Sequence, residues 1–361
     1  MVDLRRILLG WGRVGVLGFG GPPAHIRMLR QLCVERNDWI EPAEFEEAIA
    51  ACNLLPGPAS TQLSIWSAWR VGGPLGGLVG GLAFILPGFV AIVGLSMLFL
   101  GSHPPTWIVG AGAGAGAAVA AVALHAAWSL TPTSWARTPS RVRWVGYALA
   151  AGIATATVGP WVVLVLLACG LIEMGWSRYG LRPTQPTTYA WTLPALLWTA
   201  FKVGALSYGG GFVIIPLMRG DAVDRFGWMT SQHFLDAVAL GQITPGPVVH
   251  TVGAVGYAAA GIPGAVLATV VAFAPSFLFV LVGAPLFDRM RRARGPQAFL
   301  AGAGPAAIGA IVGSTVPLAQ ALTEPWQWVV LGSAAVLLFI GRVGVVTTLL
   351  VAAIAGVLTV V

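Results

Sequence analysis

Long apolar stretches alternate with short polar or glycine- and proline-rich interruptions along almost the whole chain. About 20 apolar residues suffice for a helix to cross a bilayer. The pattern therefore predicts an all-α polytopic membrane protein with six apolar segments in each half. In the first half they lie at about 8–24, 48–68, 75–100, 107–128, 144–158 and 160–175, and in the second at 193–218, 237–259, 263–286, 298–321, 326–341 and 343–361.

The composition supports this fold class and excludes several functions. The 361 residues are 57% hydrophobic and only 9% charged, and the mean hydropathy is +0.82. Of the 20 basic residues only Lys202 is a lysine, and most arginines fall in short loops, where they indicate membrane topology and not nucleic-acid binding. The first segment lacks a cleavage site and is expected to be a retained helix. The three scattered cysteines predict buried thiols without a disulfide or metal framework.

The chain contains an internal duplication. Shifting the sequence by 189 positions aligns residues 14–58 with 203–247, and about a third of the aligned residues are identical. The identities include glycines, charges, a tryptophan and a whole Pro-Gly-Pro, which hydrophobic composition alone would not produce. We expect an N-terminal transporter repeat at 1–176, a polar linker at 177–192 and a C-terminal repeat at 193–361.

Charge distribution predicts that the two repeats have opposite orientations. The loop after the third segment is neutral in the first half (101–106) but strongly basic in the second (288–294). The next loop contains Arg137, Arg141 and Arg143 in the first half, whereas its equivalent in the second half contains only Glu324. Under the positive-inside rule, such swaps indicate an inverted repeat. Six crossings per half would instead make the halves parallel. An odd crossing must therefore be hidden, for example in a re-entrant broken segment.

Each repeat is interrupted by Pro-Gly-Pro, at 56–58 and 245–247, inside an apolar segment. Proline cannot continue a helix, and in hydrocarbon a break survives only where protein or a watery cavity satisfies the backbone. Glycine clusters at 20–21 and 209–211 break the preceding segments. Helix N-termini with free N–H groups bind anions, so four converging breaks would form an anion site. The alternative is that the breaks only let helices pack. The candidate residues are Gly20, Gly21, His25, Pro56, Gly57, Pro58, Ser60, Thr61, Gln62, Gly209, Gly210, Pro245, Gly246, Pro247, His250 and Thr251.

Several charged residues are further candidates. Arg30 and Arg219 follow the glycine clusters at equal spacing and suit a tetrahedral oxyanion, although pairing with Glu35 and Asp224 explains them equally. Lys202 lies about ten residues into an apolar segment, where a charge usually faces a cavity. The acids Glu35, Glu47, Asp224 and Asp236 are candidates for proton coupling, with stabilisation of a helix N-terminus as the alternative for Glu47 and Asp236.

The motifs Phe19-Gly20-Gly21-Pro22-Pro23-Ala24-His25-Ile26 and Leu55-Pro56-Gly57-Pro58-Ala59-Ser60-Thr61-Gln62 resemble the signature motifs of the chromate ion transporter family, in its long two-domain form. The resemblance implies a bacterial inner-membrane carrier that exports chromate on the proton gradient, gives chromate resistance and is related to sulfate handling. Its motif positions correspond to Gly20, Gly21, Pro22, His25, Pro56, Gly57, Pro58 and Gln62. The second half departs from the motifs at Gly211, Ile214 and Thr251, so the two half-sites are not expected to be equivalent.

The sequence therefore predicts a secondary transporter of a tetrahedral oxyanion, chromate or sulfate, embedded in the cytoplasmic membrane. An anion channel of the same architecture is the alternative. The chain has no HExxH, GxSxG or P-loop motif, so we expect neither an enzyme nor an ATP-driven pump, and no cofactor or nucleic-acid partner. A homodimer is carried as a hypothesis. The alanine–glycine run at 111–116 has no preceding strand and is expected to pack helices, not to bind a dinucleotide.

Overall fold

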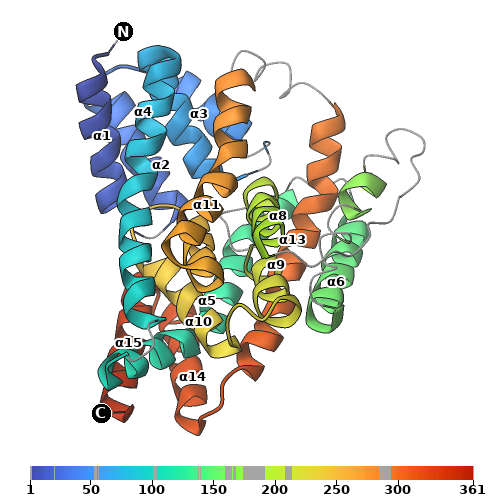
Figure 1. The fold of residues 1–361 in the computed structure, drawn as a ribbon. Coiled ribbons are helices and arrows are strands. Elements are labelled where there is room, and N and C mark those ends of the chain that lie inside the picture. Colours follow the sequence, from blue (N-terminus) through green and yellow to red (C-terminus); the bar gives the residue numbers. More distant parts are fainter. Residues whose placement is uncertain are drawn as a thin grey trace.

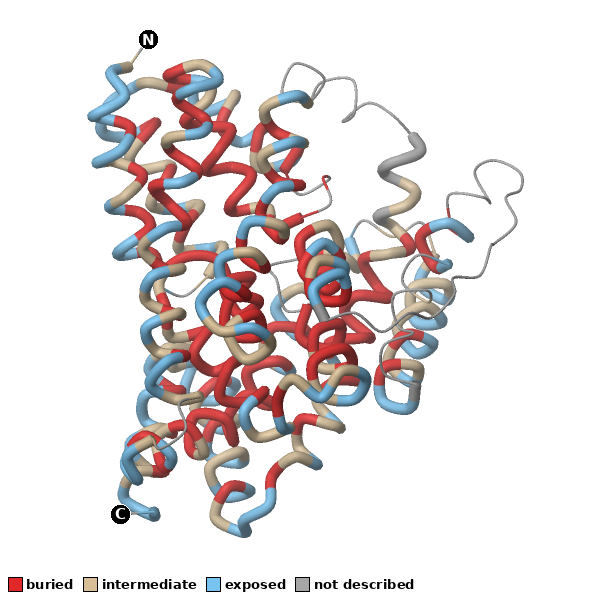
Figure 2. Tube along the Cα trace, viewed as in Figure 1, coloured by how far each residue is buried: buried red, intermediate tan, exposed pale blue. Residues whose placement is uncertain are grey.

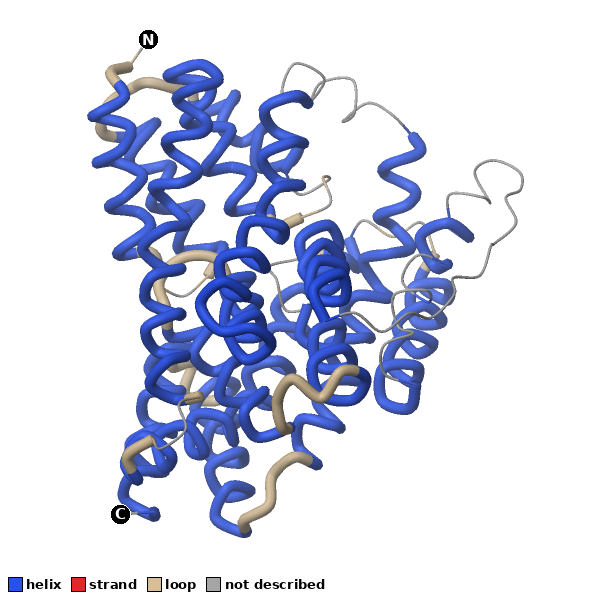
Figure 3. The backbone as a smooth tube through the Cα atoms, viewed as in Figure 1, coloured by secondary structure: helices blue, strands red, loops and turns tan. Residues whose placement is uncertain are grey.

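A computed structural model describes residues 2–19, 21–52, 55, 57–100, 104–136, 138, 140–158, 165, 168–173, 192–207, 214–283 and 294–360. Its regular elements are all helical (Figure 3). In the first half these are α1 (Leu4–Leu17), α2 (Pro22–Arg30), the π-helical turn η1 (Gln31–Glu35), α3 (Pro42–Cys52), α4 (Ala59–Phe99), α5 (Thr106–Ala136) and α6 (Arg141–Val158). In the second they are α8 (Thr192–Leu206), α9 (Ile214–Arg219), the π-helical turn η3 (Gly220–Arg225), α10 (Ser231–Ile243), the 3-10 turn η4 (Val248–His250), α11 (Thr251–Gly283), α13 (Arg294–Gln320), α14 (Pro325–Phe339) and α15 (Val345–Val360).

The polytopic membrane fold predicted from the sequence is confirmed. Four stretches in the described part of the chain are long and apolar enough to cross a membrane: Ala59–Phe99, Thr106–Ala136, Val248–Gly283 and Ala301–Gln320. Buried residues follow the interior of the helical bundle, while the outward faces remain exposed (Figure 2). Large apolar side chains on those faces, such as Val90 and Ile354 at 66% and 60% exposure, suit contact with lipid tails.

Two helical hairpins open the first half. In the first hairpin, α1 enters and α2 returns, so that Gly10 and Leu32 lie side by side. In the second hairpin, α3 enters and the first arm of α4 (59–73) returns, and an ion pair between Glu44 and Arg70 joins the two outer ends. The charged stretch between His25 and Glu47, which separates the first two predicted apolar segments, is therefore mostly helix. The segment predicted at 48–68 is wrong as a single span, because its break turns the chain back and does not merely kink it.

The second half repeats this arrangement. In the third hairpin, α8 lies against η3, and the Thr199 hydroxyl donates a hydrogen bond to Asp221. Thr199 and Asp221 are the repeat equivalents of Gly10 and Leu32. In the fourth hairpin, α10 is followed by η4 and the first arm of α11 (251–260), and Gly241 lies against Thr251. Gly73 and Gly261 have positive φ values of 69° and 64°, which divide α4 and α11 into two arms at matching places.

The repeats also match in packing detail. Gly15 of α1 lies against the second arm of α4 (74–99), where an added Cβ would be 2.6 Å from the Phe84 carbonyl oxygen. Its equivalent, Gly204 of α8, lies against the second arm of α11 (262–283), where a Cβ would be 2.0 Å from the Ala272 carbonyl oxygen. A larger residue at either position would push the paired helices apart. The π-helical turns η1 and η3 also begin at equivalent positions, 31 and 220.

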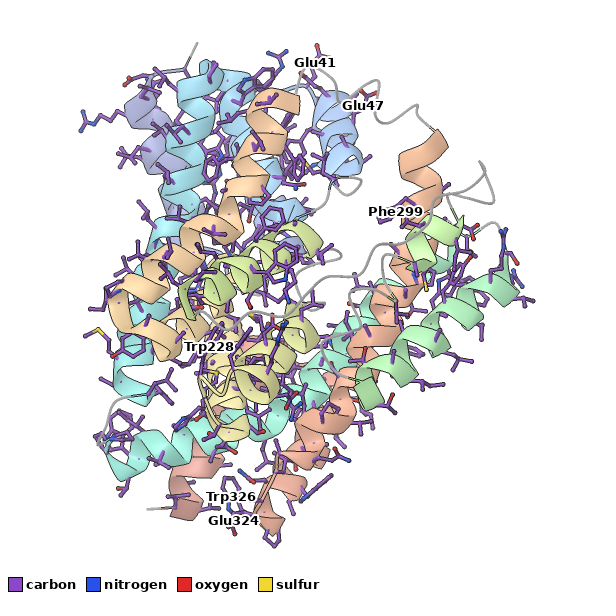
Figure 4. All side chains as sticks on the ribbon, turned by 45° about the vertical axis from the view of Figure 1, so that its right-hand side comes forward. Glu41, Glu47, Trp228, Phe299, Glu324 and Trp326 are labelled. Atoms are coloured by element: carbon purple, nitrogen blue, oxygen red, sulfur yellow. The ribbon has the colours of Figure 1, made fainter. Side chains whose placement is uncertain are left out.

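The second arms of α4 and α11 run in opposite directions. Gly77 contacts Leu281, and four residues further along α4, Gly81 contacts Phe277, which lies four residues earlier in α11. Figure 4 places Glu41, next to the start of α3, at the upper end of the molecule, and Trp228, shortly before α10, in the lower half. The second arms, which hold equivalent positions in the two repeats, are therefore antiparallel.

The remaining helices, α5, α6, 168–173, α13, α14 and α15, form what we call the scaffold. Within it the halves are interleaved, because α5 packs on α14 and α15 of the other half, while α13 packs on α6 and on 168–173 (Figure 1). Small residues make these crossings close. A Cβ on Gly114 would lie 2.1 Å from the Ala352 carbonyl oxygen, and one on Gly309 would lie 1.9 Å from that of Ala148. The glycines of the alanine–glycine run thus serve helix packing, as predicted.

Candidate functional site

The described tips of the first, second and fourth hairpins come together. Gly246, in the second Pro-Gly-Pro, donates its backbone N–H to the Gly18 carbonyl in the first hairpin tip at 2.9 Å. Gly57, in the first Pro-Gly-Pro, faces α8, with its Cβ position 3.4 Å from the Gly204 carbonyl oxygen. Each Pro-Gly-Pro therefore contacts the opposite half. Positive φ values of 119° at Gly57 and 94° at Gly246 permit these turns.

His25 ties the first hairpin tip to the second. The ring is fully buried, with Nε2 2.8 Å from the Gly18 carbonyl oxygen and Nδ1 3.2 Å from Ser60 Oγ. A carbonyl only accepts, so Nε2 carries a proton and donates to it, which leaves Nδ1 of the neutral ring to accept from the Ser60 hydroxyl. The edge of the ring also contacts Phe84, at 5.0 Å between ring centroids. His25 thus links the first hairpin tip to the start of α4.

His250 occupies the corresponding centre of the second half. It is fully buried and stacks obliquely on Phe273. Neither ring nitrogen makes a well-formed hydrogen bond with the described residues, although the Ile85 backbone is close enough to interact with the ring. Gly88 of α4 allows this approach, since its Cβ position lies 2.5 Å from His250 Cε1 and 2.1 Å from the Pro245 carbonyl oxygen.

Two helix N-termini supply free backbone donors. Pro58 and Pro247 are the N-caps of α4 and η4, so a helix begins directly after each Pro-Gly-Pro. Thr61 and His250 donate their N–H groups to the carbonyls of those prolines. The N–H groups of residues 59, 60, 248 and 249 make no hydrogen bond within the described part of the chain. Such donors, at the positive ends of helix dipoles, favour an anion.

A cavity of about 380 Å³ opens beside these termini. Ala59 and Val248, the first residues after the two Pro-Gly-Pro motifs, both line it, together with the first hairpin tip, the end of α10, α5 and the start of α15. The full lining is Gly21, Pro22, Pro23, Ile26, Ala59, His125, Ala126, Ser129, Leu130, Gly241, Gln242, Thr244, Gly246, Val248, Val345 and Val346. Both repeats therefore contribute to one space large enough for a small oxyanion and several waters.

Polar side chains in this cavity are available to a ligand. Gln242 and Thr244 are 7% and 4% exposed, and Gln242 Nε2 and Thr244 Oγ1 have no hydrogen-bond partner in the described structure. Buried polar atoms are rarely left unpaired, so an unpaired one marks a place for water or a ligand. His125 and Ser129 reach the cavity from α5. None of these four was among the predicted site residues. Gln242 and Thr244 precede the second Pro-Gly-Pro directly, but His125 and Ser129 could be found only from the fold.

The structure distributes the predicted motif residues unevenly. Gly21 and Gly246 line the cavity, while Pro245 and Pro247 flank Gly246. Ser60, Thr61 and Gln62 are fully buried behind it in the first turn of α4, and the Thr61 hydroxyl has no partner in the described structure. Thr251 is buried and donates to the Val248 carbonyl at 2.8 Å. Gly20, Pro56, Gly209 and Gly210, like 177–191 of the linker, lie outside the described residues.

The two predicted arginines lie away from the cavity. Arg30 pairs with Glu46 and, at 3.6 Å, with Glu35, while Arg219 pairs with Asp224 at 2.9 Å. Pairing with nearby acids, the alternative left open from the sequence, therefore describes both arginines. It also occupies Glu35 and Asp224, two of the four acids considered for proton coupling.

Lys202 takes part in a buried ion pair and does not face the cavity. Its Nζ lies 2.5 Å from Asp221 Oδ2, which also accepts from the Thr199 hydroxyl at 2.7 Å. Lys202 is 8% exposed and Asp221 is fully buried. The sequence analysis did not single out Asp221, although it falls in a stretch equivalent to Leu32. The first half has no such cluster, because its equivalents are Gly10, an exposed Arg13 and Leu32.

The remaining two acids occupy equivalent positions but different surroundings. Asp236 of α10 is 8% exposed, accepts from Gln232 Nε2 at 3.1 Å and faces glycines of α5. Glu47 of α3 is exposed, at the upper end of the molecule (Figure 4). Of the residues described, no group of three or more His, Cys, Asp or Glu side chains is placed to hold a metal ion.

Comparisons with known proteins agree with this architecture. The family model described as chromate transporter matches residues 5–174 and again 194–357. A chromate transport protein of Cupriavidus metallidurans is 31% identical over 88% of this chain and 83% of its own length. A probable chromate transport protein of Synechococcus elongatus is 32% identical over 88% and 85%, and a chromate transport protein of Pseudomonas aeruginosa is 31% identical over 95% and 89%. No solved structure matches the chain.

Proposed function

The chain belongs to the chromate transporter family, and we propose that it is a secondary transporter that exports chromate, a tetrahedral oxyanion, across the inner membrane of a bacterium. Three curated relatives that cover most of the chain carry chromate transport in their names. Export driven by the proton gradient would lower the chromate concentration in the cell and so give resistance.

The observation that carries the proposal is the cavity between the two Pro-Gly-Pro motifs. Two helix N-termini present free N–H groups at residues 59 and 248, and Gln242 and Thr244 add buried side-chain donors. Together they suit an anion that accepts hydrogen bonds on several oxygens at once. Because most of these donors are uncharged dipoles, the site can bind an anion and still release it.

The opposite orientation of the two repeats supports a carrier. We propose an inverted repeat of 1–176 and 193–361, since helices at equivalent positions run antiparallel and loop charge shifts between equivalent loops. In carriers of this kind the substrate site lies between the repeats near the bilayer midplane, where broken helices meet. Asp236, buried beside the cavity-lining end of α10, is the acid best placed to carry a coupled proton.

Flux measurements in proteoliposomes test this function. We expect saturable chromate uptake that depends on an imposed pH gradient. Gln242→Leu and Thr244→Val, which remove the unpaired donors, should each raise the KM for chromate several-fold. Gln320→Leu, on the exposed end of α13, is the matched control and should transport like the unchanged protein.

Other outcomes separate the alternatives. Chromate flux that is linear in concentration and indifferent to the pH gradient would make the protein a channel. Sulfate uptake with a lower KM than chromate would make sulfate the substrate, because both anions are tetrahedral dianions. If the Gln242 and Thr244 variants transport like the Gln320 variant, the anion does not bind in this cavity.

A further inference from the structure

The anion cavity has a repeat-related counterpart in the other half. The anion cavity lies where α2 of the first hairpin faces α5. Its counterpart lies where α9 and η3 face α13 and α6. That second space has a volume of only about 10 Å³, at or below what a single water needs. Four residues of the open cavity have positional equivalents in the closed one. Ile26 corresponds to Ile215, and with the Ala-Gly runs of α5 and α13 in register, Ala126 corresponds to Ser314, Ser129 to Pro317 and Leu130 to Leu318.

Exposure of the side chains shows the same difference. Ile215, Ser314 and Leu318 are each 1% exposed. In the open cavity, Ile26 and Leu130, the equivalents of Ile215 and Leu318, are half-buried, and Ser129 is exposed. One pair of equivalent interfaces, α2 with α5 and α9 with α13, is thus open in one half and closed in the other.

A second pair of equivalent interfaces also differs between the halves. The interface of α10 with α5 is closed, whereas its equivalent, α3 with α13, is open. α10 packs closely on α5, where an added Cβ on Gly116 would lie 3.1 Å from the Cβ of Leu235. An added Cβ on Gly112 would lie 3.1 Å from Asp236 Oδ1. The equivalent helix α3 makes at most marginal contact with α13 in the described part of the chain, and Glu47, the equivalent of Asp236, is exposed.

These differences are what one tilt of the four hairpins against the scaffold would produce. Tilting one way closes α9 on α13 and α10 on α5, and leaves α2 apart from α5 and α3 apart from α13. Since the two repeats have the same helices at the same positions, the opposite tilt can form the equivalent contacts in the other half. A transporter with one binding region between inverted repeats changes its access in this way.

We propose that the closed space bounded by Ile215, Ser314 and Leu318 is the second access route of the oxyanion, which opens when the hairpins tilt and the cavity at Ile26, His125 and Ser129 closes. The same tilt buries Glu47 against α13 and exposes Asp236, so that the two equivalent acids exchange surroundings in each cycle. The identity of the anion rests on the proposed function, whereas the exchange of the two routes rests on the repeat symmetry alone.

Paired cysteines can trap each state. Gly116→Cys with Leu235→Cys should form a disulfide in the state described, because their Cβ positions are in contact. The repeat-equivalent pair, Glu46→Cys with Gly304→Cys, should form a disulfide only after the opposite tilt. Oxidation of either pair should abolish transport, and a reductant should restore it.

Reporter cysteines then show which route is open. With the first pair locked, a membrane-impermeant thiol reagent should label Ser129→Cys and leave Leu318→Cys unlabelled. With the second pair locked, the labelling should reverse and occur from the opposite side of the membrane. Val312→Cys on the outward face of α13 is the control for lipid-exposed positions and should stay unlabelled in both. The native cysteines, Cys33, Cys52 and Cys169, are buried and give the background.

The proposal is overturned if the second pair never cross-links in a protein that transports. It is also overturned if Leu318→Cys stays unlabelled with the second pair locked, or is labelled from the same side as Ser129→Cys. Cross-linking and labelling are themselves measured without chromate. Reciprocal labelling without chromate flux would therefore refute the proposed substrate and leave the two access routes standing.

Discussion

Gly88 is the position where a single methyl group most directly tests how the hairpin tips meet. It lies on the second arm of α4, against the second Pro-Gly-Pro. A Cβ there would lie 2.1 Å from the Pro245 carbonyl oxygen, about 0.9 Å short of the 3.0 Å that real Cβ contacts respect. The same Cβ would lie 2.5 Å from His250 Cε1. Gly88→Ala therefore requires the tip to move away from α4.

The cost of that movement follows from what the tip holds. Overpacking by one methyl group in a close-packed interior typically costs about 1–3 kcal/mol. Losing the hydrogen bond from Gly246 to Gly18 would add about 0.5–1.5 kcal/mol. We expect Gly88→Ala to lower the unfolding temperature in detergent by several degrees and, because the displaced tip carries a cavity-lining N–H group, to raise the chromate KM about tenfold or more.

Gly94→Ala is the matched control for this experiment. It adds the same methyl group six residues further along α4, where no atom lies within 4 Å of the Cβ position. We expect unfolding temperature and chromate flux to equal those of the unchanged protein. If Gly88→Ala behaves like Gly94→Ala in both assays, the second Pro-Gly-Pro does not pack on α4 as described.

Three further substitutions test other parts of the centre. His25→Phe keeps the ring but removes its bonds to Gly18 and Ser60, and should cost about 1–3 kcal/mol in unfolding measurements; unchanged stability would mean that the imidazole does not join the tips. Asp221→Asn leaves Lys202 without its buried counter-charge, which typically costs about 3–5 kcal/mol, so folded yield should fall sharply and recover in the double variant with Lys202→Met and Asp221→Leu. Gly57→Ala imposes a backbone strain of about 1–3 kcal/mol at φ 119° and should impair both folding and flux; Gly12→Ala, which meets nothing within 4 Å, should leave both intact.

The sequence predicted the features that depend on local chemistry. Pro-Gly-Pro breaks a helix wherever it occurs, and a shared pattern of glycines, prolines and charges reveals a duplication in any fold. The all-α membrane fold is confirmed on this basis, and the free N–H groups at residues 59 and 248 directly follow the two Pro-Gly-Pro motifs.

The features that depend on how segments fold back could not be predicted. Whether the chain turns back between α3 and α4 or continues depends on partners distant in sequence, such as Glu44 with Arg70. His125 reaches the cavity only because α5 crosses the hairpin tips. Asp221 looks unremarkable beside its equivalent Leu32, and its role emerges only when η3 returns along α8 to meet Lys202.

The interleaved scaffold has a consequence for the order of events during synthesis. The glycine face of α5 packs on α15, the last helix of the chain, through Gly110, Gly114 and Gly356. A ribosome must therefore add more than 200 residues after α5 before α5 can acquire this neighbour. Until then, the glycine face of α5 must be covered by lipid or by insertion chaperones. Loss of α15 alone would therefore leave a helix of the other half without its partner.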